Sequence, residues 1–123
     1  MTTTRKTDEA ATRTAAETYF SAWKARDFDR LRSVLADGVS FRGPLGTADG
    51  PDECVKGIEG MSQIVTDIDV KAVTVDGEDV VTMFELHTRP APPMLTANWS
   101  RVRDGRIAQI RVAFDPRPLL DAS

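Results

Sequence analysis

The sequence predicts an α+β fold in which N-terminal helices pack on a curved, mostly antiparallel β-sheet. The first half of the chain carries apolar residues at helical spacing, whereas apolar and polar residues alternate from about Thr66 onward. Helices followed by a run of strands are typical of α+β proteins. We expect a sheet of about four to six strands that wraps around the first helix. One face then meets the helices, and the other meets solvent or a second subunit.

Length and composition indicate one globular domain. The chain has 123 residues, of which 41% are hydrophobic and 28% charged, and a net charge of -3. This charge argues against a nucleic-acid-binding surface. The single Cys54 cannot form an internal disulfide, so we expect a cytoplasmic protein. We predict no membrane span and no secretory signal. The expected divisions are a flexible N-terminus at 1–9, a single domain at 10–118 and a C-terminal tail at 119–123.

Three helices and a short strand are expected before Thr66. Apolar residues at Ala16, Tyr19, Phe20 and Trp23 predict an amphipathic helix with Asp8 as its N-cap. This helix is followed by a second helix from Asp27 to the C-cap Gly38, a short strand at 39–42, a loop at 43–50 and a helix beginning at Pro51.

Turn signals divide the second half into strands. Asp76-Gly77 and Asp104-Gly105 each separate two alternating runs and therefore predict hairpins. Pro116 ends the last run, because proline cannot continue a strand ladder. The predicted strands lie at 68–75, 78–88, 94–103 and 106–114.

Three sequence features together resemble a known family. They are the aromatic helix YFSAW at 19–23, the segment KARDFDRLRSVLADGVSF at 24–41 and the turn GPLG at 43–46. The chain resembles the SnoaL-like and ketosteroid isomerase-like branch of the nuclear transport factor 2-like superfamily over about residues 10–115. This resemblance implies a cone-shaped fold with a mixed sheet around a pocket, and a homodimer. It leaves the reaction open, because the fold carries isomerases, hydrolases, cyclases, dehydratases and non-catalytic binding proteins.

The resemblance assigns roles to three positions. Tyr19 matches the tyrosine that donates a hydrogen bond to the oxyanion in ketosteroid isomerases, and Asn98 matches, within one residue, the second donor. Gly43 stands where those enzymes carry their carboxylate base. The familiar route of steroid isomerisation is therefore not expected. The Asp-Arg-Asp trio of the limonene epoxide hydrolase subgroup is not identified.

Two pairs of residues are candidates with two interpretations each. Tyr19 and Trp23 lie one helical turn apart and form either a pocket wall with phenol and indole donors or ordinary core. Glu85 and His87 share one strand face with Met83. They are either a general base with its orienting neighbour, or residues of the convex face with Phe84 and Leu86 inside.

The last two strands supply further candidates. Asn98 shares a polar row with Thr96 and Ser100, which can hold a ligand oxygen if it faces the cavity. Asp115 lies either at the cavity rim or in a surface ion pair with little effect on stability. We expect Ile110 to belong to the face that meets the cavity. The residues expected to contact a ligand are Trp23, Phe41, Leu45, Met61, Met83, Ile110, Val112 and Phe114.

These residues predict a pocket for a small apolar molecule. We expect a cofactor-independent acid–base enzyme of the isomerase, cyclase, dehydratase or epoxide hydrolase type. Tyr19 and Asn98 would polarise an oxygen, while His87 with Glu85, or else Asp115, would move the proton. The alternative is a non-catalytic ligand-binding or dimeric interaction module. No cofactor is expected, because nucleotide-binding glycine motifs are absent, and no metal site, because the chain has one histidine and no paired ligand spacing.

Overall fold

The computed structural model describes residues 2–122, and the side chains of residues 9–121. It confirms the α+β class, with helices packed on a six-stranded sheet. None of the helices in the described residues is both long and apolar enough to cross a membrane. In chain order the elements are α1 (Thr2–Ala25), α2 (Phe28–Ser33), β1 (Leu35–Gly43), β2 (Gly46–Asp49), α3 (Pro51–Ser62), β3 (Val65–Asp76), β4 (Asp79–Thr88), β5 (Met94–Arg103), β6 (Arg106–Ala113) and α4 (Arg117–Ala122).

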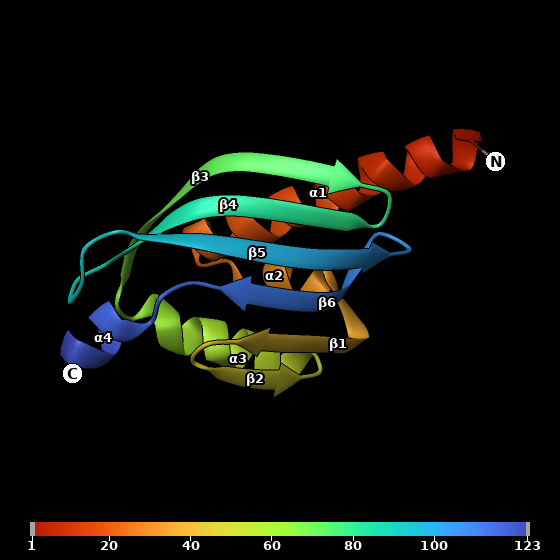
Figure 1. Ribbon diagram of the computed structural model, residues 1–123. Coiled ribbons are helices and arrows are strands. Elements are labelled where there is room, and N and C mark those ends of the chain that lie inside the picture. Colours follow the sequence, from red (N-terminus) through yellow and green to blue (C-terminus); the bar gives the residue numbers. More distant parts are fainter. Residues whose placement is uncertain (1, 123) are drawn as a thin grey trace.

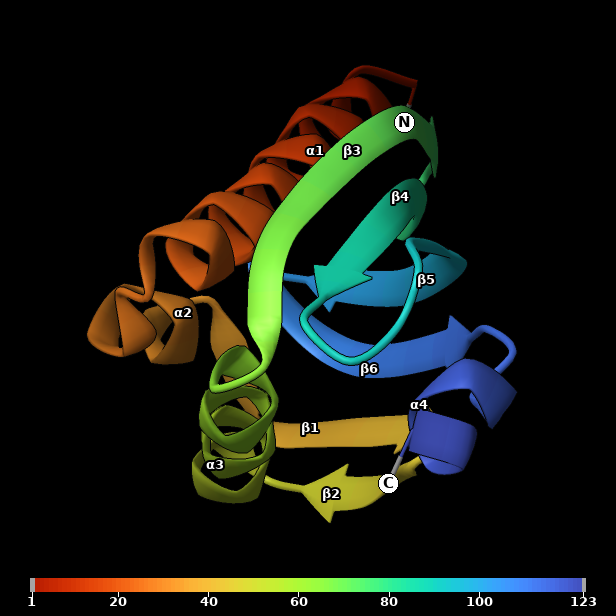
Figure 2. The same cartoon turned by 90° about the vertical axis from the view of Figure 1, so that its left-hand side faces the viewer.

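The sheet is mixed and strongly curved. Its strand order is β2-β1-β6-β5-β4-β3, and every neighbouring pair is antiparallel except β1 and β6, which run parallel. The helices α1, α2 and α3 lie behind the sheet in Figure 1, and Figure 2 shows the sheet curling around that side. All three of these helices lie on the same side of the sheet, whereas Figure 2 shows the short helix α4 on the other side.

Both predicted hairpins form. Asp104 and Gly105 join β5 to β6 with φ angles of 53° and 76°, as a two-residue turn of the type favoured by Asp-Gly requires. The β3–β4 turn lies against α1. There, Thr12 Oγ1 donates to the carbonyl oxygen of Gly77 at 2.8 Å, and the Gly77 N–H donates to Glu9 at 2.9 Å.

Several predicted boundaries are wrong. Helix α1 begins at Thr2 rather than after Asp8, whose side chain lies outside the described residues. Helix α2 ends at Ser33, so Gly38 lies within β1 rather than at a helix end. The predicted loop contains β2, which pairs with β1 because the edge of that strand offers unpaired backbone groups. The predicted C-terminal tail contains most of α4.

Candidate functional site

A cavity of about 470 Å³ lies between the concave face of the sheet and helices α1 and α3. Its wall is mostly apolar. The exposed residues of its lining, which include Leu45, Glu53 and Lys56, place its mouth between the β1–β2 turn and α3. The lining comprises Tyr19, Trp23, Phe41, Gly43, Pro44, Leu45, Gly46, Thr47, Ala48, Glu53, Cys54, Lys56, Gly57, Ile58, Met61, Phe84, Leu86, Thr96, Asn98, Val112 and Phe114.

Tyr19 is the buried hydrogen-bond donor of the helical wall. Its side chain is 2% exposed and packs edge-on against Trp23, with ring centroids 6.2 Å apart. Burial, and to a smaller extent Cys54, raises the pKa of the Tyr19 phenol, so the hydroxyl stays protonated at neutral pH. Among the described residues no acceptor is bonded to this hydroxyl. The Trp23 indole N–H, in contrast, donates to Ser62 Oγ at 3.1 Å and is not available to a ligand.

Asn98 is the second donor of the cavity and comes from the sheet. It is 2% exposed and lies in the buried row predicted for Thr96, Asn98 and Ser100. Ser100 Oγ donates to Asn98 Oδ1 at 2.8 Å. This bond uses the amide oxygen and orients the side chain, so the Nδ2 group remains as a donor with no acceptor in the described part of the chain.

The remaining titratable groups of the cavity come from α3. Burial and the carboxylates of Asp49 and Glu53 raise the pKa of the Cys54 thiol to about 11, against a smaller opposite effect of Arg42. The thiol is therefore neutral and weakly nucleophilic at pH 7. The exposed Glu53 carboxylate accepts a hydrogen bond from the Asp49 N–H at 2.9 Å. Lys56 is exposed one helical turn from Asp52.

The structure brings together most of the predicted ligand-contacting residues. Their shared property is a position on α1, at the β1–β2 corner, on α3, or on the inner face of β5 and β6. The predicted residues that line the cavity are Tyr19, Trp23, Phe41, Leu45, Met61, Asn98, Val112 and Phe114. Their roles toward a ligand stay predictions.

Glu85, His87 and Met83 do not line the cavity. All three project from the outer face of β4, whereas Phe84 and Leu86 are 2% exposed on the inner face. The second of the two interpretations of this strand is therefore confirmed. The physical reason is the cost of removing a carboxylate and an imidazole from water without full pairing, which Phe84 and Leu86 do not incur.

Two other predicted residues also lie away from the cavity surface. Ile110 is fully buried in the core and has no place in the cavity lining. Asp115 is exposed, and its carboxylate pairs with Arg117 at 2.7 Å. Hydrogen bonds from the Arg117 side chain and backbone lower the pKa of Asp115 to about 2. Asp115 thus forms a surface ion pair, but with Arg117, whereas Arg111 on the last strand donates to Ser40.

Sequence reasoning did not select several residues of the lining. Phe84 and Leu86 are predicted to face inward only in the second interpretation of β4. The polar side chains of Glu85 and His87 on the other face of this strand are the signal that favours this interpretation. Cys54 and Ile58 follow the helical period of α3 and line the cavity, but neither is among the residues predicted to contact a ligand. Glu53 could not be predicted in this way, because it does not belong to the apolar pattern of α3.

The described residues contain one group of three histidine, aspartate or glutamate side chains that lie close enough together to hold a metal ion. It consists of Asp69, Glu85 and His87 and lies on the outer face of the sheet, not in the cavity.

Comparison with known proteins establishes the family. The model of the SnoaL-like domain matches residues 16–110, and no curated protein matches significantly. A crystal structure from Kribbella flavida DSM 17836 is 33% identical, with a TM-score of 0.82, covering 88% of this chain and 89% of that one.

Two more distant crystal structures share the fold. A nuclear transport factor 2-like protein from Cytophaga hutchinsonii ATCC 33406 is 23% identical, with a TM-score of 0.81, covering 89% of this chain and 94% of its own. An LEH-like epoxide hydrolase from M. tuberculosis is 21% identical, with a TM-score of 0.77 and coverages of 93% and 90%. With the family model matching most of its length, the chain belongs to the SnoaL-like domain family and has the nuclear transport factor 2-like fold.

Proposed function

We propose that the protein binds a small, largely apolar molecule in the concave cavity, and that Tyr19 and Asn98 donate hydrogen bonds to an oxygen of this molecule. The observation that carries the proposal is a pair of neutral donors in an apolar cavity, with no acceptor bonded to them among the described residues. Both donors line the cavity, and a hydrogen bond to a ligand contributes about 0.5–1.5 kcal/mol. A ligand carbonyl, hydroxyl or epoxide oxygen would supply the acceptor.

A pair of ligands with one changed group tests this proposal. The ketone 2-acetylnaphthalene and the hydrocarbon 2-ethylnaphthalene have nearly the same shape, but only the ketone carries an oxygen acceptor. We expect the protein to bind the ketone more tightly, by about tenfold if two donors contribute, as measured by quenching of tryptophan fluorescence. Asn98→Leu should reduce the difference. Equal affinities for both ligands would refute the role of the donors, and binding of neither would refute the apolar pocket.

A second candidate function is acid–base catalysis on such a ligand. The observation in its favour is the Glu53 carboxylate, which shares the cavity with Tyr19 and Asn98. Polarisation of a carbonyl or epoxide oxygen by the donors, with proton transfer to or from Glu53, would give an isomerase, cyclase, dehydratase or epoxide hydrolase. Because an epoxide hydrolase shares this fold, styrene oxide is a suitable first substrate to test. In the expected reaction, water opens the epoxide and gives a diol.

The matched variants Glu53→Gln and Glu59→Gln distinguish catalysis from binding. Both remove an exposed carboxylate of α3, but only Glu53 lines the cavity. Glu53→Gln should lower turnover of styrene oxide by at least about tenfold, while Glu59→Gln leaves it unchanged. Equal turnover in both variants would exclude Glu53, and no turnover by the wild type would leave binding as the proposed function.

We further propose that the part of the outer face around Leu95 and Trp99 on β5 pairs with a second copy of the chain and leaves the β3 side of this face open. Leu95 and Trp99 are 62% and 45% exposed on this face, and Met83 lies beside them in the strand register. Exposed apolar side chains grouped on one face are typical of interaction surfaces. A reducing cytoplasm, in which Cys54 stays a free thiol, is the proposed location.

A further inference from the structure

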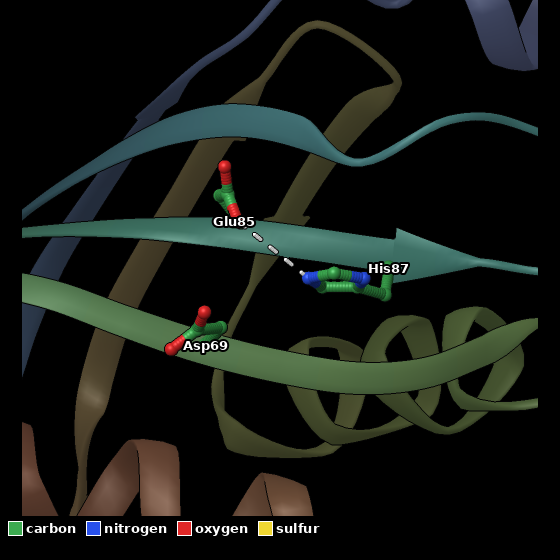
Figure 3. A group of neighbouring side chains, drawn as sticks. All are labelled: Asp69, Glu85 and His87. Carbon is green, nitrogen blue, oxygen red and sulfur yellow. Dashed lines mark ion pairs between the residues drawn. The ribbon is translucent and has the colours of Figure 1, made fainter.

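Three side chains with metal-binding groups converge on the outer face of the sheet. Asp69 lies on β3, directly opposite Glu85 in the register of β3 and β4, and His87 follows two residues later on the same face of β4. Their ligand atoms all lie within 4.8 Å of one another. Figure 3 shows the three side chains on the two neighbouring strands. The strands fix the Cα positions, so only side-chain rotations are needed to bring the donors closer.

The imidazole of His87 has an unused donor atom in this group. Its Nε2 is buried and has no hydrogen-bond partner in the described part of the structure. The nearest carboxylate oxygen, Glu85 Oε1, lies 3.7 Å away, beyond the length of a hydrogen bond. A buried nitrogen without a partner is unfavourable, and coordination of a cation is one way to satisfy it.

We propose that Asp69, Glu85 and His87 bind a divalent transition-metal cation, with Zn²⁺ as the best match. One imidazole nitrogen and two carboxylate oxygens suit Zn²⁺, whereas Mg²⁺ and Ca²⁺ prefer oxygen ligands alone. In a tetrahedral site with bonds of about 2.0–2.2 Å, two ligand atoms lie about 3.3–3.6 Å apart. The three ligand atoms lie within 4.8 Å of one another, so side-chain rotations that shorten these distances would accompany metal binding. Water would complete a tetrahedral shell on the open side.

The ammonium group of Lys71 lies beside the two carboxylates that would bind the metal ion. Its Nζ lies 2.7 Å from Asp69 Oδ2 and 3.8 Å from Glu85 Oε1. The side chain is about half exposed and projects from the irregular stretch between Val70 and Ala72, so it can turn toward solvent. Lys71 and the metal therefore compete for the same carboxylates. This competition distinguishes a metal site from carboxylates that only form ion pairs with Lys71. If the site binds metal, removal of Lys71 should strengthen the binding.

Titration of the untagged full-length protein tests the site. Calorimetry with Zn²⁺ should give one site per chain, and Co²⁺ should give visible absorption bands that Zn²⁺ abolishes. We expect His87→Ala and Glu85→Gln to weaken Zn²⁺ binding by at least about tenfold. Lys71→Met should strengthen it by about fivefold, as expected for removal of one charge near the ion in high dielectric. The control Glu59→Gln removes an exposed carboxylate of α3 and should have no effect.

Three results would overturn the proposal. They are the absence of saturable Zn²⁺ binding up to about 1 mM, unchanged affinity in His87→Ala, and unchanged or weaker affinity in Lys71→Met. Circular dichroism shows whether each variant is folded. If His87→Ala is unfolded, Glu85→Gln and Lys71→Met decide the outcome, because both replace partly exposed side chains with others of similar size.

Discussion

The hydroxyl of Tyr19 and the thiol of Cys54 are neutral for the same reason, which is burial beside the cavity. A neutral phenol donates a hydrogen bond without requiring a counter-charge, so an apolar site can accommodate it. A neutral thiol adds apolar surface rather than a nucleophile. The two residues therefore favour binding of an uncharged ligand.

Tyr19→Phe tests the donor at the scale of one atom. The variant removes the hydroxyl and keeps the ring contacts with Phe20 and Trp23. We expect affinity for 2-acetylnaphthalene to fall by about threefold to tenfold, the effect of one hydrogen bond. Affinity for 2-ethylnaphthalene should stay the same, as measured by fluorescence titration. An equal loss for both ligands would mean that the change acts through packing.

Cys54 predicts a dependence of stability on alkaline pH. Its pKa is raised from 9.0 to about 11 in the folded protein, so folding favours the protonated thiol. This contribution is complete below about pH 9 and is lost as the pH rises through about 11. The difference in unfolding free energy between wild type and Cys54→Ala should therefore be constant from pH 7 to about pH 9 and then change in favour of the alanine variant. Urea unfolding at several pH values measures it, and a constant difference up to about pH 11 would contradict the assigned pKa.

At the scale of elements, α1 is joined to the far end of the β3–β4 hairpin. Thr12 is 1% exposed and donates to Gly77 from a position many residues away in the chain. This contact ties the helix that carries Tyr19 to the sheet that carries Asn98. A side chain outside the cavity therefore helps to hold α1 against the sheet.

Thr12→Val should destabilise the protein. Valine has nearly the same shape but cannot donate, so the Gly77 carbonyl loses a partner at a cost of about 1–3 kcal/mol. Chemical denaturation measures the loss, and hydrogen exchange should show faster opening of the hairpin amides. Thr14→Val on the exposed side of the same helix is the control and should be near neutral. Equal effects of both variants would point to helix propensity instead of the contact.

Strand β4 shows where sequence reasoning succeeds and where it stops. Alternation correctly divides the strand into two sets of residues, but the period alone does not say which set faces the helices. One of the two interpretations places Glu85 and His87 in the cavity, together with the predicted ligand contact Met83. All three lie outside it, because a carboxylate and an imidazole are more easily solvated on the outer face. Asp69 and Glu85 become neighbours only through the pairing of β3 with β4. A search for short motifs in the sequence cannot detect that these two residues are neighbours.

At the scale of the whole molecule, the two faces of the sheet have different properties. The concave face holds the apolar cavity, and the outer face holds Leu95, Trp99 and the proposed metal ligands. Tyr19 and Asn98 were found through the family resemblance, since neither has a spacing that distinguishes it from core. The overall class was predictable from periodicity, whereas β2 was not, because its glycine-rich sequence is typical of a loop.

The double variant Leu95→Arg/Trp99→Arg tests the proposed dimer. It places two positive charges on the outer face, which a second copy would have to bury. We expect the wild type to sediment as a dimer and the variant as a monomer at about 50 µM, a concentration at which a weak dimer is still detected. Binding of 2-acetylnaphthalene should be unchanged. Leu120→Arg, at another exposed apolar residue, is the control and should remain a dimer. A monomeric wild type would refute the proposal.

The β1–β2 corner and α3 follow one another in the chain and together supply most of the cavity lining. The segment from Phe41 to Met61 contributes one continuous wall and the mouth, while α1 and the other strands contribute the donors. Gly50 joins the two parts and is held by a hydrogen bond from its N–H to the Val39 carbonyl at 2.7 Å. Because Tyr19 and Asn98 come from other elements, substitutions confined to residues 41–61 would change the shape and polarity of the wall and mouth without replacing either donor. The choice of ligand is therefore encoded largely in one continuous stretch of the chain.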